Sequence, residues 1–384
     1  MRNTTLLGGL ATARFMRRHW QKSAHLARQA LPGFPGIVNR RELFALAGRD
    51  DVESRVVVKS GAGAPTWSLE RGPFPLRFFK SLPPTNWTLL VQGLDLHLDA
   101  ASALIRRFAF LPYARLDDLM VSYAVPGGGV GPHFDSYDVF LLQGPGRRRW
   151  RTSTQADLSL VPDLPLKILA HFEPEHDWVL DPGDMLYLPP SVAHDGVAVD
   201  ECMTYSIGFR APTADELVEA FLHHLPDALD IAPWRYADPD LAPTDRPGLL
   251  DPRMQKRIGT VLKAIRWSDH DVARFSGCFL SEPKADVFFD PPPAPLAVAA
   301  FARHVRRRKD GGVRLDRRSR MLYDAASVYL NGAVIASAAE HPLLRELADR
   351  RELAPESAWS RELLVLLHDA YSSGALHVGI LARP

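Results

Sequence analysis

The segment from about Val56 to Phe209 constrains the fold most, because it consists mainly of short apolar runs separated by glycine and proline. Runs of this kind, bounded by turn residues, predict β-strands. Many short strands at close spacing are typical of a sandwich or a barrel. The predicted strands are Arg55–Lys59, Trp87–Gln92, Met120–Tyr123, Asp138–Gln143, Arg148–Thr152, Trp178–Leu180, Met185–Leu188 and Cys202–Phe209. One run, Ala101–Phe108, has helical spacing instead and predicts a helix.

The pattern changes at Thr213, where Thr213-Ala-Asp-Glu216 forms a capping box at the start of a helix. The proline-rich stretch Asp290–Pro295 predicts a stiff, extended linker. Further predicted elements are helices at Arg253–Ile265, Asp269–Phe279, Leu296–Arg306, Pro342–Arg350 and Trp359–Ser372, and strands at Val313–Leu315, Met321–Asp324 and Ser327–Leu330, with a turn at Asn331-Gly332. We therefore expect an α+β protein of three units: a β-rich body with an N-terminal cap (1–212), a helical segment (213–289) and a small α+β tail (290–384).

Charge and cysteine content narrow the class of protein. The chain has 46 Lys and Arg against 45 Asp and Glu, so its net charge of +1 gives no general signature of nucleic-acid binding. The two cysteines, Cys202 and Cys278, are far apart, which excludes a cysteine-built zinc finger or disulfide scaffold and fits a reducing cytosol. No apolar stretch is long enough for a membrane helix, so we expect a cytoplasmic protein without a membrane partner.

The N-terminal segment allows two interpretations. Its first acidic residue is Glu42, and arginines are frequent before it, as in a transit peptide. Alternatively, apolar residues between Phe15 and Leu26 form one side of a short helix that caps the body. We favour the helix.

Histidines and carboxylates must build any metal site, because the cysteines are unsuitable. His133 and Asp135 follow a glycine-rich turn, and residues two apart on a strand point to the same face. A later strand, opened by the turn Asp181-Pro-Gly-Asp184 and ended by a double proline, supplies His194. Two histidines and one carboxylate form a facial triad that leaves positions open on Fe(II) for a cosubstrate and dioxygen. We predict that His133, Asp135 and His194 bind the metal.

An Fe(II) oxygenase that uses 2-oxoglutarate also needs a cation for the distal carboxylate of this cosubstrate. The run Gly146-Arg-Arg-Arg-Trp-Arg151 begins a strand on which Arg148 and Trp150 share a face. The large apolar Trp150 should point inward, and Arg148 with it. A buried guanidinium needs a partner and matches a carboxylate with two hydrogen bonds, so we predict that Arg148 binds 2-oxoglutarate.

These motifs together resemble the bacterial ribosomal oxygenases, which are JmjC-type cupin enzymes. The resemblance is carried by four segments, densely over residues 14–212: Pro126–Phe140, Gln143–Arg151, the Pro-Gly-Asp hairpin with its histidine, and Tyr205–Pro212. Shorter matches are Trp20-Gln-Lys22 and Phe34-Pro-Gly36. The resemblance implies a double-stranded β-helix as the catalytic domain, a helical dimerisation segment and a C-terminal winged-helix-like domain.

The resemblance further implies that the protein uses Fe(II) and 2-oxoglutarate to hydroxylate an arginine of the sixteenth protein of the large ribosomal subunit. Ser122 then borders the cosubstrate, and Tyr137 borders the substrate arginine. Asp138, Asp117 and Asp118 are carboxylates available for its guanidinium. Ala124 departs from the family pattern, which often has a hydroxyl at this position, so the finer cosubstrate contacts stay open.

Other functions and partners stay open at this point. A JmjC-type histidyl hydroxylase, an N-methyl-lysine demethylase and a metal-binding cupin scaffold without turnover are alternatives to the arginine hydroxylase. A homodimer is expected through the residues after Thr213. The tail suggests contact with ribosomal RNA, because the sequence between Phe301 and Arg320 contains nine basic residues and only two acidic ones. The basic residues are Arg303, Arg306, Arg307, Arg308, Lys309, Arg314, Arg317, Arg318 and Arg320, the basic strip; a solvated face is the other interpretation.

Overall fold

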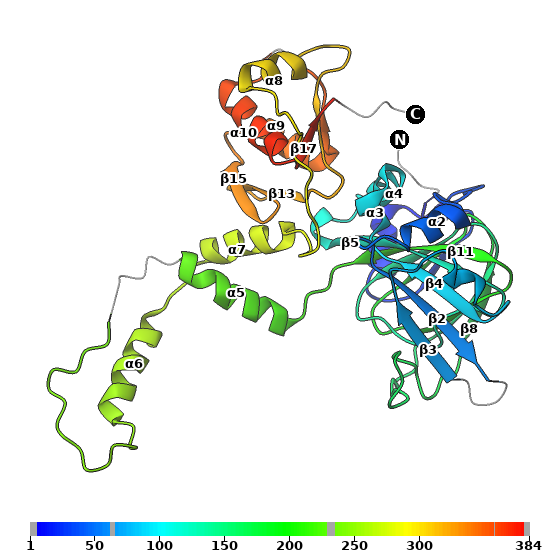
Figure 1. The fold of residues 1–384 in the computed structure, drawn as a ribbon, viewed down its shortest axis with the longest axis horizontal. Coiled ribbons are helices and arrows are strands. Elements are labelled where there is room, and N and C mark those ends of the chain that lie inside the picture. Colours follow the sequence, from blue (N-terminus) through cyan, green and yellow to red (C-terminus); the bar gives the residue numbers. More distant parts are fainter. Residues whose placement is uncertain (1–5, 62–65, 229–234, 357, 380–384) are drawn as a thin grey trace. The chain divides into compact units, whose positions relative to one another are not determined.

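Figure 1 shows the fold in a computed structural model that describes residues 6–61, 66–228, 235–356 and 358–379. The chain divides into two compact units, Met1–Ala211 and Pro212–Pro384. Each unit has a hydrophobic core of its own.

The first unit is built on two antiparallel β-sheets. The larger sheet has eight strands in the order β1-β9-β6-β11-β5-β4-β2-β3, and the smaller has three in the order β10-β7-β8. The strands are β1 (His25–Ala27), β2 (Ser54–Ser60), β3 (Thr66–Arg71), β4 (Trp87–Val91), β5 (Leu116–Ala124), β6 (Val139–Gln143), β7 (Arg148–Ser153), β8 (His176–Leu180), β9 (Met185–Leu188), β10 (Ala193–Ala198) and β11 (Cys202–Phe209).

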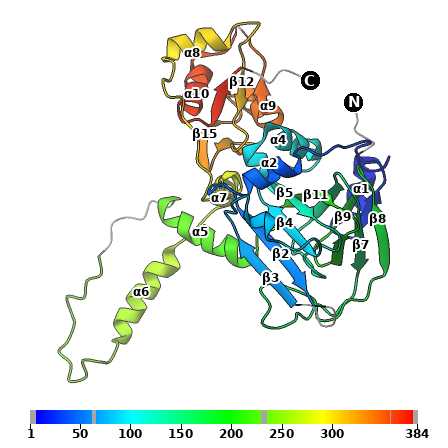
Figure 2. The same cartoon turned by 45° about the vertical axis from the view of Figure 1, so that its right-hand side comes forward.

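The two faces of the larger sheet pack differently. Leu119 and Val121 of β5 face the main core, which the N-terminal helices complete. Leu141 of β6 points the other way and packs with Trp150 and Leu180 of the smaller sheet. The helices are α1 (Thr12–Arg18), α2 (Arg40–Leu46), α3 (Leu94–His97) and α4 (Asp99–Ile105); α2, α3 and α4 lie together on one side of the strands (Figures 1 and 2). The two facing sheets form the expected double-stranded β-helix.

The structure confirms all eight predicted strands and adds β1, β3 and β10. The predicted helix through Phe15–Leu26 is partly wrong, because α1 ends at Arg18 and His25 begins β1. The left-handed backbone of Gln21, with φ of 55°, interrupts the helix, and its N–H donates to the Tyr187 hydroxyl at 2.7 Å. The apolar residues of this segment therefore belong to two elements, the helix α1 and the edge strand β1.

The second unit begins with the helices α5 (Ala214–Ala228), α6 (Pro252–Ala264) and α7 (Asp269–Ser281). The predicted capping box is present: the N–H of Glu216 donates to the Thr213 hydroxyl at 3.2 Å, and the N–H of Thr213 donates to the Glu216 carboxylate at 2.7 Å. The rest contains α8 (Val298–Val305), α9 (Pro342–Arg350), α10 (Arg361–Ser372) and two three-stranded sheets around one core.

The sheets of this unit have the orders β16-β12-β17 and β13-β14-β15. Their strands are β12 (Val313–Leu315), β13 (Met321–Tyr323), β14 (Ser327–Leu330), β15 (Ala333–Ser337), β16 (Glu352–Leu353) and β17 (Leu376–Val378). Asn331 and Gly332, with φ of 50° and 88°, form the predicted turn between β14 and β15. Within the described ranges, no helix is both long and apolar enough to cross a membrane.

Candidate metal centre

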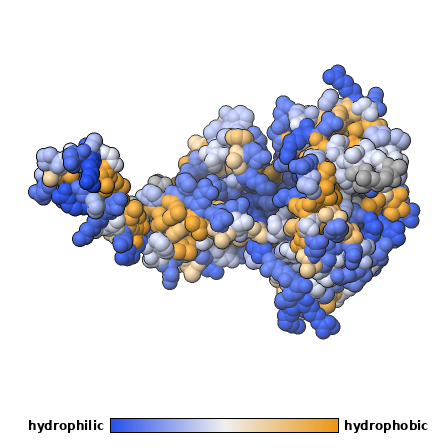
Figure 3. Space-filling view, turned by 90° about the horizontal axis from the view of Figure 1, so that it is seen from below, coloured by the Kyte–Doolittle hydropathy of each residue, from blue (hydrophilic) through white to orange (hydrophobic). Residues whose placement is uncertain are grey.

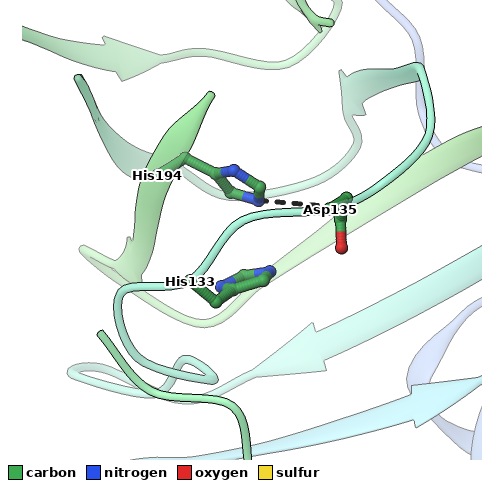
Figure 4. A group of neighbouring side chains, drawn as sticks. All are labelled: His133, Asp135 and His194. Carbon is green, nitrogen blue, oxygen red and sulfur yellow. Dashed lines mark ion pairs between the residues drawn. The ribbon is translucent and has the colours of Figure 1, made fainter. Parts of the chain in front are cut away.

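His133, Asp135 and His194 lie together, as predicted. One ligand atom from each lies within 4.8 Å of the others, and Figure 4 shows the three side chains converging on one point. The Nε2 atom of His194 is 3.6 Å from the Asp135 carboxylate, and the two imidazole centroids are 4.2 Å apart. This spacing allows the three groups to bind a single ion.

Backbone hydrogen bonds set this geometry. The N–H of His133 donates to the carbonyl of His194 at 2.9 Å, and the N–H of His194 donates back at 2.7 Å. A further bond joins the Ser191 N–H to the Asp135 carbonyl at 2.8 Å. The expectation that His133 and Asp135 lie on a regular strand is therefore wrong, because they occupy a loop that pairs with β10 only through one isolated bridge.

The glycine-rich segment before His133 brings this loop close to β10. A Cβ atom on Gly129 would lie 2.4 Å from the carbonyl oxygen of Gly196, and one on Gly128 would lie 2.1 Å from that of Trp87. Gly127 and Gly128 also exchange hydrogen bonds with Ala198 of β10, both at 2.9 Å. Only glycine permits these approaches, so the segment acts as a turn at the metal site.

Both imidazoles are held with one nitrogen free. The Nδ1–H of His133 donates to the Gly131 carbonyl at 2.8 Å, and that of His194 donates to the Val192 carbonyl at 2.9 Å. These bonds turn Nε2 of each ring toward the site, where it can act as a metal ligand. Burial, reinforced by His133, lowers the pKa of His194 to about 4, so His194 is neutral at physiological pH.

The donor set fits a divalent transition metal. Two neutral imidazoles and one carboxylate are the ligands of the facial triad that binds Fe(II) and leaves coordination positions open. The side chain of His194 is 3% exposed, whereas Asp135 is 23% exposed, so ligands can approach from the Asp135 side.

Arg148 lies on the inner face of β7, as predicted. Arg148 and Trp150 are only 4% and 5% exposed, and two guanidinium atoms of Arg148, Nε and Nη2, are buried without a hydrogen-bond partner among the described residues. A buried, unpaired guanidinium is costly unless an anion joins it. The structure thus contains a cationic group that is prepared for an acidic ligand.

The neighbouring arginines have opposite surroundings. Arg147 pairs with Asp200 at 2.9 Å, Arg149 with Asp177 at 2.8 Å and Arg151 with Asp195 at 2.5 Å. We call these three pairs the outer row. The alternation along β7 follows the strand period of two, as the sequence predicted.

Ser122 is buried on β5, on the side that faces Arg148. It shares a strand face with Ala124, which packs with Ala198, and Ala198 is the register partner of Arg148. The absence of a hydroxyl at Ala124 leaves Ser122 as the hydroxyl that β5 offers on this face near Arg148.

Tyr137 lies near the metal ligands and is 41% exposed. Burial raises the pKa of its hydroxyl, and the carboxylates of Asp135, Asp118 and Asp117 raise it further. Arg55, which sequence reasoning missed, acts in the opposite direction. The phenol therefore stays protonated and marks an acidic region beside the metal centre.

Asp138 has a different environment. Its carboxylate is completely buried and accepts hydrogen bonds from Tyr187 at 2.6 Å, Gln21 at 3.0 Å and Arg115 at 3.2 Å. It therefore holds the N-terminal segment against the sheet, and its buried carboxylate does not face a substrate as predicted. Its partner Gln21 lies far away in the sequence, so no local pattern could have revealed this role.

Comparison with known proteins gives matches along nearly the whole chain. Residues 103–217 match the family described as JmjC domain, and residues 264–377 match the ROXA-like winged helix. Ribosomal protein uL16 3-hydroxylase of Escherichia coli (strain K12) is 38% identical over 283 residues, or 73% of this chain and 74% of that protein. A probable ribosomal oxygenase of Haemophilus influenzae is 38% identical over 220 residues, or 56% of this chain and 54% of that protein.

A solved structure extends the similarity to the complete fold. YcfD, a ribosomal oxygenase from Escherichia coli in complex with cobalt and 2-oxoglutarate, superposes with a TM-score of 0.79 at 32% sequence identity. The match covers 96% of this chain and 98% of that chain. It confirms the expected cupin body and winged-helix tail. The inner-facing triad, the buried arginine and these similarities together show that the chain belongs to the JmjC-type ribosomal oxygenase family.

Proposed function

We propose that this protein is an Fe(II)- and 2-oxoglutarate-dependent oxygenase that hydroxylates an arginine side chain of ribosomal protein uL16. The relative with 38% identity is named as a uL16 3-hydroxylase, and a similar structure contains cobalt and 2-oxoglutarate. The observation that carries the proposal is the guanidinium of Arg148, which is buried with Nε and Nη2 lacking a hydrogen-bond partner among the described residues. A metal-binding scaffold without turnover has no use for such a group.

In this mechanism, His133, Asp135 and His194 hold Fe(II), and Arg148 holds the distal carboxylate of 2-oxoglutarate with Ser122 beside it. The bound iron and cosubstrate supply the oxidation: decarboxylation to succinate and carbon dioxide accompanies transfer of one oxygen atom from dioxygen to a substrate C–H bond. The Val192 and Gly131 carbonyls orient the two imidazoles, and burial keeps His194 neutral. The apolar side chains around Trp150 exclude water.

The substrate arginine is expected to lie beside Tyr137. Asp118 is 4% exposed and Asp117 is its neighbour on β5; both are close enough to raise the pKa of the Tyr137 hydroxyl. Asp118 accepts a hydrogen bond from Gln92 at 2.7 Å, so the two carboxylates contribute their negative charge, while the Tyr137 ring offers a guanidinium an aromatic face. This acidic region favours a cationic target over a neutral histidine.

A peptide experiment tests the proposal. The iron-loaded protein is incubated with 2-oxoglutarate and a uL16 peptide that contains the candidate arginine, and succinate and peptide mass are measured. We expect succinate and a mass gain of one oxygen on arginine. A gain on histidine would support a histidyl hydroxylase, loss of methyl groups from a methyl-lysine peptide would support a demethylase, and retained metal without turnover would support the scaffold. Each of these outcomes contradicts the proposal.

We also propose that the protein forms a homodimer through the helical segment 213–289. The apolar residues Val218 and Leu222 of α5 and Ile258 and Leu262 of α6 are exposed, and Figure 3 shows apolar surface over this part of the chain. Helix α6 has no buried residue, so its amphipathic pattern lacks a partner within the described part of the chain. Light scattering should give twice the monomer mass for the native protein and a monomer for the double variant Ile258→Glu/Leu262→Glu.

The basic strip of the tail is proposed to contact ribosomal RNA, which would place the protein with ribosomes in the cytoplasm. Arg318 pairs with Asp316 and serves the fold, but Arg303, Arg308 and Lys309 are exposed. Arg308→Glu/Lys309→Glu should leave turnover of a free peptide unchanged and weaken binding to a ribosomal RNA fragment at low salt. Unchanged RNA binding would favour the solvated-face interpretation.

A further inference from the structure

Trp150 lies between the two halves of the proposed site. Its ring centroid is 5.9 Å from that of the metal-ligand candidate His194, and the Cζ atom of Arg148 lies over the ring at 5.8 Å from its centroid. A molecule that bound both the metal and Arg148 would therefore pass along the indole of Trp150.

The surrounding strands fix the position of this ring. Trp150 is paired in register with Gly196 of β10, and a Cβ atom on Gly196 would lie 2.6 Å from two ring carbons. On the other side, Trp150 packs in the apolar cluster that contains Leu141, Leu180 and Leu188. The indole thus has little freedom to turn in search of a hydrogen-bond acceptor.

The indole N–H of Trp150 has no acceptor among the residues that the structure describes. Its Nε1 atom is buried and unpartnered, like Nε and Nη2 of Arg148. An unsatisfied buried donor is unfavourable, and a buried tryptophan usually finds an acceptor. Three such donors come from two neighbouring inward residues of one strand, which indicates one acceptor-rich ligand rather than separate packing defects.

We propose that Trp150 is a further cosubstrate-binding residue, whose indole N–H donates a hydrogen bond to an oxygen atom of bound 2-oxoglutarate. The inference rests on the proposed function and assigns a ligand to the third unpaired donor that the described part of the chain places on the inner face of β7.

The substitution Trp150→Phe tests this role, because it keeps an aromatic ring over Gly196 but removes the N–H. Trp178→Phe is the matched control: Trp178 pairs in register with Trp150 from β8 and packs on the same cluster, with its ring stacked on His176 at 4.9 Å. Isothermal titration calorimetry of the Mn(II)-loaded proteins gives the dissociation constant of 2-oxoglutarate, and Mn(II) binding is measured separately.

We expect Trp150→Phe to weaken 2-oxoglutarate binding about tenfold, the effect of one hydrogen bond to a charged group, with unchanged Mn(II) binding. Trp178→Phe should bind 2-oxoglutarate and Mn(II) with the same affinities as the native protein. Equal 2-oxoglutarate affinity of Trp150→Phe and the native protein would overturn the inference, as would parallel loss of Mn(II). If the native protein itself fails to bind 2-oxoglutarate, the proposed function fails instead.

A second measurement does not depend on how well the variant folds. In the Zn(II)-loaded native protein, the indole N–H signal of Trp150, identified by its contacts with Arg148 and His194, should move downfield when 2-oxoglutarate is added. The Trp178 signal should stay in place. A stationary Trp150 signal at saturating 2-oxoglutarate would contradict the proposed hydrogen bond.

Discussion

The sheet β10-β7-β8 carries arginines on both faces, and the two faces use them in opposite ways. On the outer face, Arg147, Arg149 and Arg151 each pair with an aspartate. On the inner face, Arg148 is buried, and two of its guanidinium nitrogens have no hydrogen-bond partner within the described ranges. The residue type is the same, and successive positions differ only in the direction in which the strand points them.

This difference separates groups that satisfy the fold from groups that wait for a ligand. The pairs of Arg147 and Arg149 are solvated, the Asp195 partner of Arg151 is buried, and all three arginines have their carboxylate within the protein. Arg148 and the indole N–H of Trp150 are complete only when a ligand supplies acceptors. An unsatisfied polar group inside an otherwise well-packed strand is therefore the most informative sign of function in this structure.

The largest contrast between the faces should come from β10, where the inner His194 precedes the outer Asp195. His194→Ala should lower turnover roughly 10³-fold or more, equivalent to about 4 kcal/mol, because it removes a metal ligand. Asp195→Asn should keep turnover within about twofold of the native rate, since Asp195 contacts Arg151 and not the metal. Succinate formation and bound iron measure both variants; full activity of His194→Ala would refute the metal site.

The next contrast lies on β7. Arg148→Met should reduce kcat/KM for 2-oxoglutarate about 10²-fold, because two charge-assisted hydrogen bonds are lost. Arg149→Met, one residue away, should change this value little. If the two variants behaved alike in a steady-state assay with varied 2-oxoglutarate, the assignment of the inner face to the cosubstrate would be wrong.

The substitution Arg148→Met should raise the free energy of unfolding, although it lowers kcat/KM. Arg148→Met replaces a buried, unpaired charge with an apolar side chain, so the ligand-free variant should unfold with a free energy about 1–4 kcal/mol higher than that of the native protein. Urea unfolding without metal or 2-oxoglutarate measures it. A destabilised variant would mean that Arg148 has a structural partner after all.

A substitution that disturbs packing on the inner face should lower the free energy of unfolding, by an amount similar to or smaller than the gain expected for Arg148→Met. Gly196→Ala places a Cβ atom 2.6 Å from the Trp150 ring and should lower the free energy of unfolding by about 1–3 kcal/mol. Gly208→Ala is the control, because its Cβ atom would meet nothing closer than 3.7 Å. Equal unfolding curves for the two variants would show that the Trp150 ring is free to move.

The outer row should give the smallest effects. Arg149→Gln removes an exposed ion pair with Asp177, so turnover and the midpoint of urea unfolding should stay at the native values in high salt. A large loss of activity would show instead that this face binds a substrate or a partner.

The sequence was informative wherever a local period decides the structure. The strand period placed Arg148 inward and its neighbours outward, and the capping box at Thr213 marked a helix start that the structure confirms. The spacing of His133 and Asp135 identified the metal ligands together, although the expected strand is a loop held by an isolated bridge to β10. The proximity of the groups was predictable, whereas the backbone that achieves it was not.

Contacts between distant segments were not predictable from local patterns. Asp138 looked available for substrate, but Gln21, Arg115 and Tyr187 saturate its carboxylate from three other parts of the chain. Arg55, from β2, likewise reached the surroundings of Tyr137 without any motif. Such pairings depend on how the sheet closes, which no local period encodes.

A crystal structure of the protein with Mn(II) and 2-oxoglutarate would show whether the unpaired donors on the inner face bind the cosubstrate beside the metal. We expect Mn(II) on His133, Asp135 and His194, with a carboxylate of 2-oxoglutarate accepting hydrogen bonds from Nε and Nη2 of Arg148. A structure in which Arg148 pairs with a protein carboxylate, and 2-oxoglutarate binds elsewhere, would contradict this expectation.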